Sequence, residues 1–263
     1  MNSISPNLNL MIKASEKASK VLIRDFGELE KLQVSKKGPT DFVTNSDLKA
    51  EKIIIEELKK GRPNYSIISE ESELKKNKDI ENTWIIDPID GTVNFLHGIP
   101  HFAISVALER EDEIICGVIF DPIKDEIFLA EKDQGYYLNN HRLRVSKRKK
   151  FEDCLILTGG PSYKDLNKNI SFDNYIKISK LANSPIRKMG SASLDMAYIA
   201  AGRADGFFQK GLSYWDIAAG IILVKEAGGI ISDFDGNSNF IDDKNIIASN
   251  TNINTDLIDL LNK

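Results

Sequence analysis

Residues 84–108 read WIIDPIDGTVNFLHGIPHFAISVAL, and this stretch decides how the surrounding chain is expected to fold. Its two ends, 84–86 and 103–108, are apolar and rich in branched residues, which predicts two buried strands. The hexapeptide DPIDGT at 87–92 lies between them. Its proline favours extended backbone, its glycine permits a tight turn, and its threonine suits the start of a helix. The stretch therefore predicts a strand that ends abruptly in an acidic turn, followed by sheet.

The patterns on both sides add helices and strands in mixed order. Apolar residues recur every three or four positions over 8–29 and 47–60, which predicts two amphipathic helices. Strands without strict βαβ alternation favour an α+β fold or a layered α/β/α sandwich, in one compact unit over 1–263 with packed halves 1–150 and 151–263. The other expected elements are strands at 65–69, 114–120, 126–130 and 155–157, helices at 175–181, 193–201 and 217–227, short strands near 230 and 246, and a last helix at 255–261.

The composition excludes two broad classes of protein. The chain has 263 residues, 35 Lys and Arg against 39 Asp and Glu, and 41% hydrophobic residues. A broadly basic nucleic-acid-binding protein and a disordered acidic chain are both poor fits to this balance. Cys116 and Cys154 lie far apart with no CxxC motif, which indicates a reducing compartment. The first residues lack the apolar segment of a secretory signal, and no stretch is long and apolar enough to span a membrane, so we expect a cytoplasmic protein.

Four acidic residues follow apolar runs instead of lying on polar faces: Glu70, Asp87, Asp90 and Asp216. A carboxylate at the end of a buried strand or helix is costly unless it is paired or binds a metal, so several of them suggest a shared cation. All-oxygen ligands favour a hard ion such as Mg²⁺ over Zn²⁺. Taken alone, a DxxDG turn is more often structural than functional, and the sequence pattern leaves both interpretations open.

Long motifs give the acidic turn its context, because the chain resembles the inositol monophosphatase family, in particular its bacterial SuhB-like branch. The resemblance implies a layered αβαβα sandwich of the inositol monophosphatase and fructose-1,6-bisphosphatase type, with Mg²⁺-dependent phosphomonoesterase activity. It also implies inhibition by Li⁺. The motifs are SEES at 69–72, the stretch 84–108, YWDIAAGIILVKEAGG at 214–229, DFVTNSD at 41–47 and GSASLDMAYIAAGRADGFF at 190–208.

The resemblance also implies roles for individual residues in binding two or three Mg²⁺ ions. Glu70, Asp87 and the carbonyl of Ile89 would bind the first ion. Asp87, Asp90 and Asp216 would bind the second. A third, looser ion would contact Glu70 through water. Glu70 and Thr92 would orient and deprotonate the attacking water. Asp47 would form a hydrogen bond with Thr92. The N–H groups of Gly91 and Thr92 would hold the phosphate.

The substrate implied by the resemblance is a sugar-alcohol phosphate, with myo-inositol monophosphate first. The polyol would contact Asp90, the N–H of Ala192, and Gln209. Inositol phosphatases usually have Glu at the position of Gln209, and the loss of that charge could weaken binding by roughly 1–2 kcal/mol. Fructose 1,6-bisphosphate, a nucleotide 3′-phosphate and histidinol phosphate therefore remain alternative substrates.

Two basic segments and the implied partners complete the set of predictions. HRLRVSKRKK at 141–150 holds seven cationic residues and is most simply a solvated hairpin, the alternative being contact with RNA or an acidic partner. Lys36 and Lys37 belong to a loop that the resemblance places over the active site. The resemblance further implies a homodimer, and a regulatory role in transcription complexes is the alternative from another class.

Three further residue types receive structural interpretations. Gly98 and Pro100 separate His97 from His101, which argues against a helical zinc site. Both cysteines lie in apolar, strand-like runs and are expected to be inert core thiols. Trp215 is expected to pack the turn that directs Asp216.

Overall fold

The computed structural model describes residues 4–29, 34–36, 42–72, 76–159, 176, 178–180 and 184–262. Ser5 caps the first helix through its side chain, and proline follows at the first helical position. The helices are α1 (Pro6–Phe26), α2 (Asn45–Gly61), α3 (Thr92–Leu96), η2 (Phe151–Asp153), α5 (Ala192–Ala200), α6 (Tyr214–Glu226) and α7 (Asn254–Asn262). The strands are β1 (Val34–Lys36), β2 (Phe42–Thr44), β3 (Tyr65–Ser69), β4 (Asp79–Asp90), β5 (Ala103–Arg110), β6 (Glu113–Asp121), β7 (Glu126–Glu131), β8 (Gly135–Leu138), β9 (His141–Leu143), β10 (Ile156–Thr158), β11 (Ile186–Arg187), β12 (Gly206–Lys210), β13 (Ile230–Ser232) and β14 (Asn245–Ser249).

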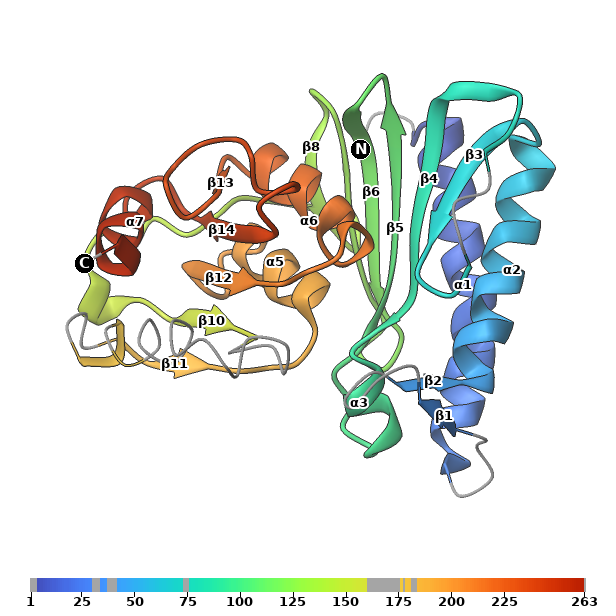
Figure 1. The fold of residues 1–263 in the computed structure, drawn as a ribbon, viewed down its shortest axis with the longest axis horizontal. Helices are drawn as coiled ribbons and strands as arrows, with labels where there is room; N and C mark the ends of the chain where they lie inside the picture. The colour runs from blue at the N-terminus through green and yellow to red at the C-terminus, as the bar shows by residue number, and fades with distance from the viewer. Residues whose placement is uncertain are drawn as a thin grey trace.

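The elements stack in five layers, α1 and α2 first, then a seven-stranded sheet, then α5 and α6, then a five-stranded sheet, and finally α7 (Figure 1). The larger sheet has the order β3-β4-β5-β6-β7-β8-β9, and only β3 and β4 pair in parallel. The smaller sheet has the order β11-β10-β12-β14-β13. A short hairpin of β1 and β2 lies beside α2. This arrangement is the expected αβαβα sandwich.

The two faces of β4 show why the layers form. Trp84 and Ile86 point to one face and pack with α1 and α2, whereas Ile85 points to the other and packs with α5 and α6. Successive side chains of a strand alternate between faces, so a fully apolar strand must be covered on both. The far side of the smaller sheet is covered by α7, through Leu257 and Leu261. The described helices include none that is both long and apolar enough to cross a membrane.

The predicted elements are largely present, with differences at their ends. The strand predicted at 84–86 is the middle of β4, which extends to Asp90 because its pairing with β5 skips two positions between Asp87 and Asp90. This bulge accommodates Pro88, which lacks an N–H for the ladder. The helix predicted to begin at 217 starts at Tyr214, because Ser213 and Asp216 form a capping box.

Some strands were not predicted, and one predicted helix is described only in part. The unpredicted strands of the two large sheets are β8, β11 and β12, all five residues or shorter and therefore weak in periodicity, whereas β9 lies in the segment expected to form a hairpin. Of the helix expected at 175–181, the described residues 176 and 178–180 are helical, and the other three positions lie outside the described residues.

Candidate active site

The turn after β4 has a conformation that requires glycine. Gly91 has φ of +99° and precedes α3. A Cβ at this position would lie 3.2 Å from the carbonyl oxygens of Gly190 and His101. Residues that carry a side chain rarely adopt a positive φ, and the neighbouring backbone leaves little room for a Cβ. Before the turn, the N–H of Ile89 donates to Asp87 Oδ1 at 3.0 Å, which fixes the Asp87 carboxyl against its own backbone.

The four acidic residues singled out from the sequence come together around Asp87. Asp87 is only 1% exposed, and burial raises the pKa of its carboxyl well above its usual range. The charges of Glu70, Asp90 and Asp216 raise that pKa further, in this order. Because burial and like charges both oppose ionisation, the four carboxyls cannot all stay charged here unless a cation neutralises them.

The four carboxyls reach this site from different elements. Glu70 directly follows β3, and its N–H bonds the Ile86 carbonyl at 3.2 Å, which places it beside β4. Asp216 belongs to the first turn of α6, where its Oδ2 accepts from the N–H of Ser213 at 2.7 Å. The site is therefore assembled from the end of one strand, the bulge of the next and a helix more than 120 residues further along the chain.

The carboxyls bind local donors in this structure. In the described part of the chain, no three acidic, histidine or cysteine side chains are arranged to hold a metal ion. Asp87 accepts from Ile89 and also hydrogen-bonds Glu70, whereas Asp90 accepts from α5 and Asp216 from Ser213. The donors still fit a hard divalent cation, because all are oxygens and their crowded negative charge is what a cation neutralises.

Asp90 is held by two residues that the sequence did not single out. Its Oδ2 accepts from Ser191 Oγ at 2.6 Å, from the N–H of Ser193 at 2.7 Å and from Ser193 Oγ. These bonds lower the pKa of the Asp90 carboxyl, whereas burial raises it by more, so the net direction is upward. A serine before an apolar helical pattern is typical of a helix N-cap, and this is the local signal that the GSAS segment offers. Their partner is about 100 residues away and was not recognisable.

Thr92 and Asp47 are neighbours, as the family resemblance implied. Thr92 Oγ1 lies 3.5 Å from Asp47 Oδ1, a long hydrogen bond, and donates more closely to the Ile89 carbonyl at 3.0 Å. Asp47 is fully buried, and its Oδ2 accepts from the N–H of Thr44 at 2.8 Å in the capping box of α2. Asp47 thus links the start of α2 to the start of α3.

The two other residues expected to contact the polyol lie in the second half of the chain. Ala192 is the first residue of α5, and its N–H also interacts with Asp90. Gln209 lies in β12, where its amide packs so closely on Gly159 that any Cβ there would clash. No hydrogen bond between described residues connects Gln209 to Asp90 or Asp216, so the structure leaves its predicted role untested.

The weaker predictions have mixed outcomes. Cys116 and Cys154 are buried free thiols, and burial raises their pKa to about 12 and about 11, as expected for inert core residues. Trp215, in the first turn of α6, is partly buried and packs against the core. His97 is exposed and follows α3, whereas His101 is buried, and burial followed by the charge of Lys124 lowers its pKa to about 4.

The basic segment 141–150 is less free than its composition suggested. Its first residues form β9, and its Arg148 donates to the buried Asp205 at 2.9 Å. Ser146, also in the segment, donates to the same carboxyl. Part of the segment is therefore a structural attachment to the second half. The Lys36 side chain and Lys37 lie outside the described residues.

Comparison with known proteins agrees with this architecture. Residues 4–263 match the inositol monophosphatase family. An inositol-1-monophosphatase of Rhizobium meliloti is 49% identical over 94% of this chain and 92% of its own, and the Nus factor SuhB of Escherichia coli K12 is 41% identical over 94% and 92%. The crystal structure of the extragenic suppressor protein suhB from Bartonella henselae has 47% identity and a TM-score of 0.95, over 98% of this chain and 99% of that one. The chain therefore belongs to the inositol monophosphatase family, in its bacterial SuhB-like branch.

Proposed function

We propose that this protein is a Mg²⁺-dependent phosphatase that hydrolyses myo-inositol monophosphate to inositol and phosphate. Membership of the inositol monophosphatase family makes phosphatase activity the expected chemistry. The observation that carries the proposal is the buried Asp87 carboxyl with the charges of Glu70, Asp90 and Asp216 around it. A phosphate ester could approach such a site only if cations neutralised it, and all-oxygen ligands favour magnesium.

Each predicted residue has a defined task in this proposal. Glu70, Asp87, Asp90, Asp216 and the Ile89 carbonyl would hold the ions. When bound, Mg²⁺ activates water and stabilises the departing alkoxide. Thr92 and Glu70 orient the attacking water and accept its proton, while Asp47 fixes the Thr92 hydroxyl. The N–H groups of Gly91 and Thr92 donate to phosphate oxygens, and Ala192, Asp90 and Gln209 contact the polyol.

Phosphate release tests this proposal. The purified protein should release phosphate from myo-inositol 1-phosphate only with Mg²⁺, and Li⁺ should inhibit it. Asp90→Asn and Asp216→Asn should each abolish turnover without unfolding the protein. Asp125→Asn is the matched control, since Asp125 is an exposed turn residue and asparagine tolerates its φ of 53°. Full activity of either site variant would refute the proposal.

The substrate is tested by a panel that includes fructose 1,6-bisphosphate, a nucleotide 3′-phosphate and histidinol phosphate. If Gln209 contacts the polyol, Gln209→Glu should lower KM for inositol phosphate and leave KM for the nucleotide unchanged. A higher rate on any other member of the panel than on inositol phosphate would reassign the substrate.

The name of the Escherichia coli relative, a Nus factor, supports a second candidate function, a binding role in transcription. A deletion strain complemented with the Asp216→Asn variant separates the two functions. Rescue by the inactive variant favours the binding role, and failure to rescue favours the phosphatase role. We also propose a homodimer, which the molar mass from light scattering tests.

A further inference from the structure

We propose that Ser193 is a positioning residue that fixes the Asp90 carboxylate for metal binding, an inference that rests on the function proposed above. Three hydrogen bonds from α5 and the residue before it end on one oxygen of Asp90, Oδ2. Ser193 supplies two of the three, one from its N–H and one from its hydroxyl. The N–H of Ala192 also interacts with this carboxyl, so every donor comes from the start of α5.

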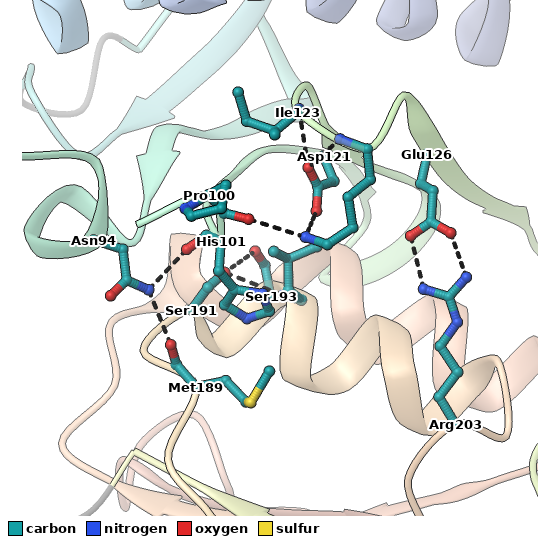
Figure 2. Close-up of polar contacts among 12 residues, drawn as sticks. Asn94, Pro100, His101, Asp121, Ile123, Glu126, Met189, Ser191, Ser193 and Arg203 are labelled. Atoms are coloured by element: carbon teal, nitrogen blue, oxygen red, sulfur yellow. Dashed lines mark hydrogen bonds and ion pairs between the residues drawn. The ribbon is translucent and has the colours of Figure 1, made fainter. Parts of the chain in front are cut away.

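The backbone of β4 explains how Asp90 reaches α5. The pairing of β4 with β5 skips from Asp87 opposite Ser105 to Asp90 opposite Ala103. A bulge of this kind redirects the side chain that follows it. The Asp90 carboxyl consequently lies against the first turn of α5, where Ser193 is fully buried and Asp90 is 8% exposed. Figure 2 shows Ser191 and Ser193 side by side at this end of the helix.

The turn that leads into α5 is itself fixed to the acidic turn. Asn94 of α3 donates through Nδ2 to the carbonyls of His101 at 2.7 Å and Met189 at 2.9 Å (Figure 2). Gly190 follows with φ of +90°, and a Cβ there would lie 2.9 Å from Asn94 Nδ2. The donors on α5 therefore stand at a fixed position relative to Asp90 before any ligand arrives.

Ser191 and Ser193 differ in their structural roles, and for this reason Ser193 is the better residue with which to test the support of Asp90. Ser191 is the N-cap of α5, and its Oγ also accepts from the N–H of Leu194 at 3.4 Å. Its replacement would weaken the helix as well as the contact to Asp90. The Ser193 hydroxyl donates to Asp90, and its one other hydrogen-bonding neighbour among the described residues is the Ser191 hydroxyl, at 3.5 Å. Loss of the Ser193 hydroxyl thus removes a support of Asp90 while the N-cap stays.

Supports behind a metal ligand affect affinity because they hold the ligand in one orientation. Their removal typically lowers metal affinity or activity by about 10–100-fold. In Ser193→Ala, Asp90 would keep the Ser191 hydroxyl and the N–H groups of Ala192 and Ser193, so we expect Mg²⁺ to bind about 10-fold more weakly. Ser193→Thr keeps a hydroxyl and should restore affinity to within about threefold of the wild type.

The test is the Mg²⁺ dissociation constant of the full chain, measured by titration calorimetry without substrate. Ser15→Ala is the matched control, because Ser15 is a buried helical serine whose hydroxyl has no partner among the described residues. It should bind Mg²⁺ as the wild type does. If Ser193→Ala does not fold, Ser193→Cys takes its place, since a thiol fills the same space but is a weak donor. kcat and KM for phosphate release provide a second readout.

The outcomes separate this inference from the proposed function. Weaker Mg²⁺ binding in Ser193→Ala, with recovery in Ser193→Thr and no change in Ser15→Ala, supports the positioning role. A wild-type affinity in Ser193→Ala overturns the positioning role and leaves the phosphatase proposal intact. A wild-type protein that binds no Mg²⁺ overturns the proposed function and this inference with it.

Discussion

Asp205 and Asp87 are both almost completely buried, yet their surroundings are opposite. Asp205 accepts hydrogen bonds from Ser146, from Arg148 at 2.9 Å and from the N–H of Leu155 at 2.8 Å. Asp87 accepts from one backbone N–H and hydrogen-bonds the Glu70 carboxyl, and the charged groups that affect its pKa are three other carboxyls. Burial of a carboxylate is tolerable when donors and a cation surround it and costly when other acids do.

This difference distinguishes a structural carboxylate from one kept for a ligand. Asp205 connects the segment after β9 to the start of β10 and to β12, so its charge is used within the fold. Among the described residues, no cation pairs with Asp87 or Asp90. Buried carboxylates without a cation destabilise the fold, and a fold keeps them only where something else compensates that cost. We propose that Mg²⁺ compensates it here.

The strongest test of the comparison is Asp87→Asn. In the proposed site the substitution would remove a ligand of both ions, so turnover should fall by about a thousandfold or more, equivalent to about 4 kcal/mol. It also removes a charge that three carboxyls oppose, so the metal-free variant should melt a few degrees higher than the metal-free wild type. Activity assays and thermal melts in EDTA measure the two effects.

Asp90→Asn applies the same test to a carboxylate that has several hydrogen-bond donors. The Asp90 carboxylate has three donors on one oxygen, so its neutral replacement loses charge-assisted hydrogen bonds as well as repulsion. The gain in melting temperature should therefore be smaller than for Asp87→Asn. A metal-free Asp87→Asn that melts below the wild type would contradict the comparison.

The structural half of the comparison is tested by Asp205→Ala. The variant leaves the Leu155 N–H and the Ser146 hydroxyl without their acceptor, so the free energy of unfolding should fall by about 2–4 kcal/mol. This loss corresponds to roughly 4–16 °C in Tm, at about 2–4 °C per kcal/mol for a chain of this size. Chemical unfolding and thermal melts measure it.

Arg148→Ala measures how much the Arg148 cation contributes to the stability of the Asp205 site. The Arg148 side chain is 45% exposed, so screening by water should limit the effect to about 1 kcal/mol or less. An Asp205→Ala variant as stable as the wild type would show that Asp205 is not the structural carboxylate described here.

The sequence predicted one side of this comparison better than the other. Glu70, Asp87, Asp90 and Asp216 were identifiable because each follows an apolar run, and a charge at that place needs an explanation. Asp205 drew no attention, because its donors lie 50 to 59 residues away along the chain. Local patterns identify a residue by its neighbours in sequence, whereas a buried ion pair is defined by contacts across the fold.

The same reason separates the predicted elements from the missed ones. Long amphipathic helices such as α1 and α2 repeat their pattern over several turns, so their existence was clear. Strand β12 has only five residues with two adjacent buried phenylalanines, and its place between β10 and β14 follows from long-range pairing. Ser193 and Asn94 were missed as supports of the site because their partners lie 103 and 95 residues away.

A third buried carboxyl, Asp195, extends the comparison to pH. Both of its oxygens are buried without a hydrogen-bond partner among the described residues, and burial followed by the charge of Asp90 raises its pKa well above the usual range. The native state therefore keeps a proton that the unfolded chain releases above its pKa of about 3.9. Stability should fall as pH rises from that value through the native pKa.

Asp195→Asn removes this proton linkage. In EDTA, its melting temperature should match that of the wild type near pH 4 and exceed it by a few degrees at pH 8. Melts across this pH range measure the difference. Asp125→Asn, at an exposed turn, should give a difference that does not change with pH. A constant difference for Asp195→Asn would show that Asp195 ionises in the native state as it does in the unfolded chain.

The smallest loss of stability is expected at an ion pair that is only partly buried, the pair of Arg203 and Glu126. Arg203 makes two hydrogen bonds to Glu126 (Figure 2). It also lies over the rings of Tyr198, at 4.9 Å, and Phe128, at 5.6 Å. Lysine keeps the charge but loses the paired hydrogen bonds and the planar contact, so Arg203→Lys should destabilise the fold by about 1 kcal/mol. The side chains of Arg203 and Glu126 are 36% and 18% exposed, which places the expected loss below that for Asp205→Ala. A loss as large as that of Asp205→Ala, in chemical unfolding, would mean that the paired geometry matters more than burial.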